Sequence, residues 1–228
     1  MNNQDITFDP VWDKLYGEGH NQRYPWDKIV SFVFRYYPRD QPRDQVNILE
    51  VGCGTGSNLW FAAREGFNVT GIDGSLKAIE YAQERFSTEN LSGNFYVGDF
   101  VNLPFKDNSF HLVIDRAALT CCGFSSAKRA ISEIGRVLKP RGHFHFNPYS
   151  DRHSSYAASI PGGDGVRDHI SQGSLTGNGQ ICFYNRSRLE EFFSSGWAIE
   201  RLQHLEHMEM QDYQFMSHAE WVVVAEKQ

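Results

Sequence analysis

The chain has 228 residues, of which 40% are hydrophobic and 22% are charged, and its formal net charge is −6. This length suffices for one domain with a full hydrophobic core, and the acidic balance argues against a nucleic-acid-binding protein, which normally presents a basic face. Since the four cysteines lack metal-ligand spacing and neither a signal peptide nor a long apolar run is visible, we expect a cytoplasmic protein without a metal or a membrane span.

The pattern of hydrophobic residues divides this single domain of residues 1–228 into four parts. Residues 1–45 are aromatic and polar and are expected to form an N-terminal cap, whereas residues 46–146 alternate between strand and helix patterns. Residues 147–185 are rich in Ser, Gly, His and Tyr without periodicity, which indicates an insert that covers a substrate. Residues 186–228 return to a helix and two strands.

The alternation of strands and helices predicts an α/β protein. In chain order, we expect a helix at about 29–37, a strand at 47–51, a helix at 57–65, a strand at 68–72, a helix at 76–86, strands at 95–97 and 110–114, a helix at 126–138, a strand at 142–146, a helix at 187–193 and strands at 198–205 and 219–226. Successive βα units build a doubly wound, mostly parallel sheet with helices on both faces.

The most informative segment reads ILEVGCGTGSN over residues 48–58 and joins a buried strand to a helix through a glycine-rich turn. Gly52 and Gly54 allow the backbone to approach a ligand closely. Asp73 ends the next strand, where a carboxylate can accept hydrogen bonds from both hydroxyls of a ribose. This layout predicts a nucleotide site at the carboxyl edge of a parallel sheet.

Two details favour S-adenosylmethionine over NAD as the nucleotide. A dinucleotide fingerprint would place its third glycine at position 57, which is Ser57. Glu50 also lies two residues before the glycine turn, and a fixed carboxylate there suits the sulfonium and ammonium groups but repels a pyrophosphate.

With these motifs the chain resembles the class I S-adenosylmethionine-dependent methyltransferases over nearly its whole length. The glycine turn resembles their first motif, residues 71–75 the second, residues 98–100 the acidic motif near the adenine, and residues 136–142 the turn before the fifth strand. The resemblance implies a Rossmann-like sheet of seven strands, mostly parallel with an antiparallel last strand.

The N-terminal part resembles a narrower group within that family. Trp12, Tyr16 and the sequence RYPW at residues 23–26 resemble the cap of small-molecule enzymes. The same RYPW and the late HAEW at residues 218–221 resemble methyltransferases of bacterial polysaccharide and sugar pathways.

The resemblance and the positions of the motifs together give the expected cofactor-binding residues. Asp73 is expected to hold the ribose, Asp99 to accept a hydrogen bond from the adenine amino group, and Arg23 to bind the methionine carboxylate. The full set is Tyr16, Arg23, Glu50, Gly52, Cys53, Gly54, Asp73, Gly74, Ser75, Gly98, Asp99, Phe100, Asp115 and Arg116.

Catalytic residues are harder to predict, because methyl transfer depends mainly on orientation and on the exclusion of water. A neutral amine acceptor needs no base, whereas a hydroxyl acceptor gains from one. His153 and Tyr156 in the insert and Asp115 at the end of the fourth strand are the candidates, and Tyr184 and His218 rank behind them.

The sequence therefore predicts an enzyme that uses S-adenosylmethionine to methylate an N or O atom of a small polar metabolite, a sugar being one candidate. Two alternatives stay open: an RNA or protein methyltransferase, which would need an open groove, and a regulator that binds S-adenosylmethionine without catalysis. The expected partner is a small acceptor molecule rather than nucleic acid, and the oligomeric state is left open.

Overall fold

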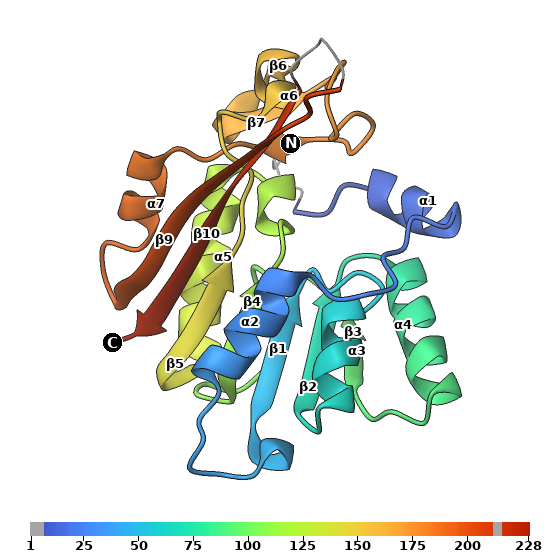
Figure 1. Ribbon diagram of the computed structural model, residues 1–228, viewed down its shortest axis with the longest axis vertical. Helices are drawn as coiled ribbons and strands as arrows, with labels where there is room; N and C mark the ends of the chain where they lie inside the picture. The colour runs from blue at the N-terminus through green and yellow to red at the C-terminus, as the bar shows by residue number, and fades with distance from the viewer. Residues whose placement is uncertain (1–6, 212–215) are drawn as a thin grey trace, which may run out of the picture.

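The computed structural model describes residues 7–211 and 216–228, so the first six residues of the expected cap lie outside the described residues. A seven-stranded sheet in the order β3-β2-β1-β4-β5-β10-β9 runs through the molecule, with helices on both faces (Figure 1). The predicted Rossmann-like α/β fold is confirmed. Within the described ranges, no helix combines the length and apolar character that crossing a membrane requires.

The first half of the sheet is built from βα units. It consists of β1 (Asn47–Val51), α3 (Ser57–Arg64), β2 (Asn68–Asp73), α4 (Leu76–Thr88) and β3 (Asn94–Val97), preceded by α1 (Val11–Gly17) and α2 (Asp27–Tyr36). Strand β1 pairs in parallel with both β2 and β4. The expected strands and helices of this half are therefore present, with ends that differ by one or two residues.

The second half continues this pattern and then reverses it. It consists of β4 (Phe110–Asp115), α5 (Phe124–Val137), β5 (Leu138–Phe146), α7 (Arg186–Phe192), β9 (Trp197–Met208) and β10 (Ser217–Lys227). Strand β10 lies antiparallel between β5 and β9, which confirms the reversed last strand. Strand β5 begins at Leu138, before the predicted start, because an irregularity between Phe110 and Leu112 lets β4 pair around the proline-containing turn.

Side chains alternate between the two faces of the sheet and form two cores. Ile48 and Leu112 pack toward α2, α3 and α4, whereas Leu49 and Val113 pack toward α5 and α7. Both cores consist of side chains with almost no exposed surface. Burial on this scale fixes the register of the strands, and thereby the positions of the residues that follow them.

Residues 147–185 contain more regular structure than the sequence predicts. They form α6 (Ser154–Ala157) and a separate small sheet of β6 (Ile160–Pro161), β7 (Val166–Asp168) and β8 (Ile181–Cys182). Strands of two or three residues are too short to show a period-2 pattern. In Figure 1 this insert and α1 lie beyond the same end of the large sheet.

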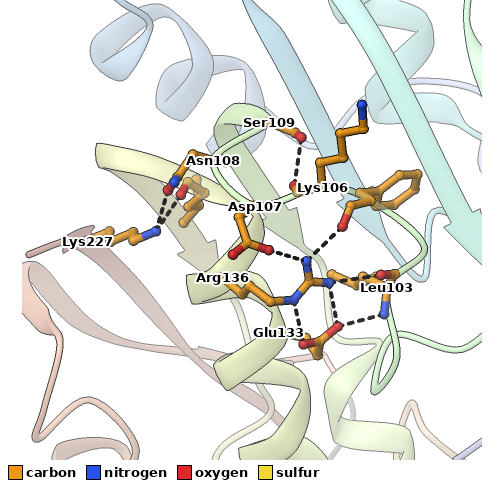
Figure 2. A network of polar contacts seen from close by, with 10 residues as sticks. Leu103, Lys106, Asp107, Asn108, Ser109, Glu133, Arg136 and Lys227 are labelled. Atoms are coloured by element: carbon orange, nitrogen blue, oxygen red, sulfur yellow. Dashed lines mark hydrogen bonds and ion pairs between the residues drawn. The ribbon is translucent and has the colours of Figure 1, made fainter.

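Arg136 near the end of α5 holds the loop before β4 (Figure 2). Its guanidinium donates hydrogen bonds to the carbonyl oxygens of Leu103 and Phe105 at 2.9 and 2.8 Å, and it contacts the Asp107 carboxylate at 2.8 Å. Glu133 binds the same guanidinium and accepts a hydrogen bond from the backbone N–H of Leu103 at 2.9 Å. The planar donor set of arginine thus replaces the strand and helix contacts that this loop lacks.

We predict that Arg136→Met lowers the free energy of unfolding by roughly 1–3 kcal/mol, because several backbone and carboxylate acceptors lose their donors. Arg186→Met is the matched control, since the Arg186 side chain is 71% exposed and pairs with Glu190 in the same helix. A loss below about 0.5 kcal/mol is expected for this control. Urea unfolding of both variants makes the comparison, and equal losses would contradict this role of Arg136.

Candidate active site

A cavity of about 440 Å³ opens at the carboxyl ends of β1, β2 and β4. Parallel strands place their following turns along one edge of the sheet, where α/β proteins bind ligands. The lining comes from these turns, from the N-terminal segment and from the insert, and it includes Phe8, Trp12, Tyr16, Trp26, Glu50, Gly52, Cys53, Gly54, Asp73, Gly74, Phe100, Arg116, Tyr149, Ser174, Leu175, Asn178 and His218. The volume lies in the range of about 300–1,000 Å³ that is typical of small-molecule sites.

The carboxylate of Asp73 at the end of β2 accepts hydrogen bonds from two backbone N–H groups. Its Oδ2 accepts a hydrogen bond from the Gly54 N–H and its Oδ1 accepts one from the Ser75 N–H, both at 2.8 Å. Burial raises the pKa of this carboxyl, although the two backbone N–H groups oppose the shift. Each carboxylate oxygen can accept a further hydrogen bond, so the geometry fits a pair of ribose hydroxyls in the cavity.

The glycine turn needs residues without a side chain at two positions. Gly52 and Gly54 have φ angles of 61° and 51°, in the left-handed region. A Cβ on Gly54 would lie 2.7 Å from the Tyr16 hydroxyl, and one on Gly52 would lie 2.0 Å from the Cβ of Ala118. Tyr16 therefore rests directly on the turn, and α1 forms part of the roof of the cavity.

Glu50 near the end of β1 is a buried carboxyl that lacks a full set of partners. Its Oε1 accepts a hydrogen bond from Asn58 Nδ2 at 2.6 Å, whereas Oε2 has no hydrogen-bond partner among the described residues. Burial raises the pKa of Glu50 to about 8 despite the hydrogen bond from Asn58. A cationic group in the cavity would relieve this cost, and the ammonium or sulfonium of S-adenosylmethionine fits that requirement.

Asp115, the last residue of β4, and Arg116, the next residue, have different surroundings. Asp115 is completely buried outside the cavity lining, and its Oδ1 accepts a hydrogen bond from the Leu119 N–H at 2.9 Å. Burial raises its pKa to about 7. Arg116 lines the cavity, with its guanidinium carbon 4.0 Å from the centroid of the Trp26 ring. Arg116 thus faces the cavity, whereas Asp115 holds the turn behind it.

The acidic motif near the expected adenine position also has only part of its residues in the cavity lining. Phe100 lines the cavity, whereas Gly98 and Asp99 do not. Asp99 accepts a hydrogen bond from the hydroxyl of Thr7. Ser75 also lies outside the lining, because its hydroxyl accepts the Ala78 N–H at the start of α4 and donates to Asp13.

Three other predicted residues do not line the cavity. The Arg23 side chain is exposed, with its guanidinium 5.9 Å from the Tyr24 ring. Tyr156 lines a second cavity, where Arg167 lies 4.2 Å from its ring. His153 is 2% exposed and reaches the first cavity only through Ser174 and His218.

Sequence reasoning missed several lining residues that come from irregular segments. Tyr149, Ser174, Leu175 and Asn178 belong to the insert, where no periodicity marks an inward-facing position. A lone histidine carries little information in a sequence, so the sequence does not single out His218. The structure places the buried Glu220, which is 4% exposed, next to His218.

A group of possible metal ligands lies elsewhere on the sheet. His143 Nε2 is 3.4 Å from Glu200 Oε2 and 3.9 Å from Glu226 Oε2, and the ligand atoms of all three residues lie within 4.8 Å of one another. The sequence did not predict this group. Arg141 also contacts Glu226, at 3.8 Å, so the residues form an ion-paired cluster, and we assign no metal to it.

The raised pKa of Glu50 predicts how stability depends on pH. A carboxyl whose pKa rises on folding stabilises the protein while it is protonated, and this stabilisation is lost as the pH rises toward the folded-state value. Between about pH 5 and pH 8, the ligand-free Glu50→Gln variant should therefore lose less unfolding free energy than the wild type, by at least about 1 kcal/mol.

Urea unfolding at both pH values measures this difference, with Glu84→Gln on the exposed face of α4 as the control. The same loss in Glu50→Gln and the wild type would show that Glu50 does not titrate in this range.

Known proteins resemble this chain over the segment that contains the glycine turn and Asp73. Residues 48–142 match a family described as a methyltransferase domain. The chain is 36% identical over 103 residues to an uncharacterized methyltransferase of Bacillus subtilis, which covers 45% of this chain and 41% of that protein. It is 35% identical over 106 residues to the phthiotriol/phenolphthiotriol dimycocerosates methyltransferase of Mycobacterium tuberculosis, which covers 46% and 37%. The chain thus matches about two fifths of the length of these curated relatives.

Among solved structures, an S-adenosylmethionine-dependent methyltransferase of Methanosarcina mazei superimposes with a TM-score of 0.70 at 22% identity, over 86% of this chain and 96% of that one. At this level of identity the likeness shows the fold. The glycine turn, the fold and the family match thus coincide on residues 48–142, which are similar to a methyltransferase domain.

Proposed function

We propose that the protein transfers a methyl group from S-adenosylmethionine to an oxygen or nitrogen atom of a small molecule. The observation that carries this proposal is that one cavity joins the features for a nucleoside, around Asp73 and Glu50, to a second set of aromatic and polar side chains, around Trp26, Tyr149 and His218. A methyl donor and its acceptor must share one site from which water is largely removed.

In this proposal, the residues of the strand ends hold the cofactor. Asp73 accepts hydrogen bonds from the ribose hydroxyls, Glu50 faces the positively charged methionine part, and Phe100 packs beside the adenine. Tyr16 covers the glycine turn from α1. S-adenosylmethionine supplies a methyl carbon already activated by its sulfonium, so the protein has to orient the acceptor and exclude water.

The size of the acceptor follows from what covers the cavity. Residues 8–20 and 174–178 both contribute to its lining, so the site lies between the N-terminal segment and the insert. This arrangement supports a small acceptor over an RNA or a protein, which would need an open groove. The relatives named above give no support to a sugar pathway, which is therefore not part of the proposal.

The ribose contact gives the first test of the proposed function. Asp73→Asn should weaken the binding of S-adenosylhomocysteine by roughly tenfold to a hundredfold, since hydrogen bonds to a charged acceptor contribute about 1.5–3 kcal/mol. Calorimetric titration measures the affinity, with Asp40→Asn on the surface as the matched control and NAD as the control ligand. Failure of the wild type to bind S-adenosylhomocysteine, or equal binding of NAD, would contradict the proposed cofactor.

The role of Glu50 is tested by comparing the binding of two ligands, one with and one without an ammonium group. S-adenosylhomocysteine carries an ammonium group, whereas adenosine does not. Glu50→Gln, which can keep the hydrogen bond to Asn58, should weaken S-adenosylhomocysteine by about tenfold and leave adenosine nearly unchanged. A similar change for both ligands would show that Glu50 only shapes the cavity.

A further inference from the structure

A group of polar side chains that the cofactor does not require lines the cavity beside Trp26 and Tyr149. Ser174 and His218 contribute to the lining, and Glu220 is buried next to them with 4% of its surface exposed. His218 and Glu220 lie two residues apart on β10, so their side chains project from the same face of that strand. The insert supplies Ser174 and His153 to the same group.

The hydrogen bonds of this group fix where its protons lie. His153 Nδ1 accepts a hydrogen bond from the Ser155 N–H at 3.0 Å, and burial, followed by the proximity of His218, lowers the pKa of His153 to about 4. His153 is therefore neutral and carries its proton on Nε2. That nitrogen lies 3.2 Å from Ser174 Oγ, which lies 3.2 Å from His218 Nδ1. His153 Nε2 also lies 3.2 Å from His218 Nδ1, so two donors neighbour that nitrogen, the His153 N–H and the Ser174 hydroxyl.

The remaining nitrogen of His218 faces a carboxylate. His218 Nε2 lies 3.6 Å from Glu220 Oε2. Burial alone would raise the pKa of Glu220, but His218, Arg116 and Lys28 outweigh it and hold that pKa well below its usual range. An ionised carboxylate beside Nε2 favours the tautomer of His218 that carries its proton on that nitrogen, so the lone pair lies on Nδ1.

The surroundings of His218 suit a flat molecule with a developing negative charge. The Arg116 guanidinium carbon lies 4.0 Å from the Trp26 ring centroid and 6.0 Å from that of Tyr149. Arg116 Nη2 lies 3.4 Å from Glu220 Oε2, and the arginine side chain is 9% exposed. Lys28 also pairs with Glu220, so this carboxylate is shared between two cations. Aromatic faces and a guanidinium beside them favour a planar oxyanion over a neutral amine.

We propose that the acceptor is a flat molecule with an acidic hydroxyl, of the phenol or enol class, and that His218 is the base that accepts its proton. This inference rests on the proposed function and names its acceptor. The acceptor hydroxyl takes the place of the Ser174 hydroxyl as the donor to His218 Nδ1. Arg116 stabilises the negative charge that develops on the acceptor oxygen.

The step balances without a further reactant. The acceptor oxygen bonds to the methyl carbon of the cofactor as the carbon–sulfur bond breaks, and the electron pair of that bond stays on sulfur. The hydroxyl proton moves to His218 Nδ1 and then to solvent, to which the His218 side chain is 35% exposed. Base catalysis of this kind contributes typically about 100- to 10,000-fold to the rate.

The experiment uses 4-nitrophenol as the probe, because its phenolate is yellow and its neutral form is almost colourless. The full-length protein is first saturated with S-adenosylhomocysteine, and 4-nitrophenol is then added at a pH at which it is uncharged in solution. We expect a yellow absorption band from phenolate bound to the wild type. In His218→Asn the amount of bound phenolate should fall by roughly tenfold or more, as expected for the loss of a charge-assisted hydrogen bond.

His169→Asn is the matched control, since His169 is exposed and has a φ of 47°, which asparagine tolerates. The band should persist in this variant. Binding of S-adenosylhomocysteine to every variant, measured by calorimetry, shows that the variant is folded. Absence of a yellow band in the wild type, or an equal band in His218→Asn, would overturn the inference. Failure of the wild type to bind S-adenosylhomocysteine would instead overturn the proposed function itself.

Discussion

The carboxylate of Asp73 joins the two turns on which the cavity is built. One of its oxygens binds the glycine turn after β1 through Gly54, and the other binds the turn after β2 through Ser75. These turns lie at one edge of the sheet because β1 and β2 are parallel and in register. The group that is expected to recognise the ribose is thus also the group that shapes its site, and the cost of burying its charge is offset by two backbone N–H groups.

Neighbouring carboxyls in the same region have different surroundings and therefore different properties. Glu50 and Asp115 are both buried, and burial raises their pKa values to about 8 and about 7. Asp115 is bound by backbone N–H groups of its own turn, but its Oδ2, like Oε2 of Glu50, has no hydrogen-bond partner among the described residues. Of these two carboxyls Glu50 lines the cavity and Asp115 does not, so a positively charged ligand group can satisfy Glu50.

The parts of the fold that the sequence predicted are those with a strong local signal. The strand from Asn47 to Val51, its glycine turn and Asp73 follow from hydrophobic runs and from the special backbone conformations of glycine. The start of β5 at Leu138 was missed, because proline and glycine in that segment normally end a strand and the irregular pairing with β4 is a tertiary effect.

The acceptor side of the site could not be predicted for a different reason. Ser174 and His218 are 44 residues apart and meet only because the insert folds back over the start of β10. The proposed role of His218 depends on Glu220 and on the neutral state of His153. Burial keeps His153 neutral, whereas His218, Arg116 and Lys28 keep Glu220 ionised despite its burial. Contacts between residues that are far apart in the chain cannot be inferred from local spacing. The sequence around His218 therefore does not reveal that these side chains surround it.

In the proposed complex, this cavity holds S-adenosylmethionine with its methyl group directed toward Trp26, Tyr149 and His218. A crystal structure of the protein with S-adenosylhomocysteine is the decisive measurement. We expect the ribose hydroxyls on Asp73, the ammonium beside Glu50 and the sulfur facing the side of the cavity that Arg116 and His218 line. A nucleoside bound outside this cavity, or one with its sulfur directed away from those residues, would refute the proposed binding mode.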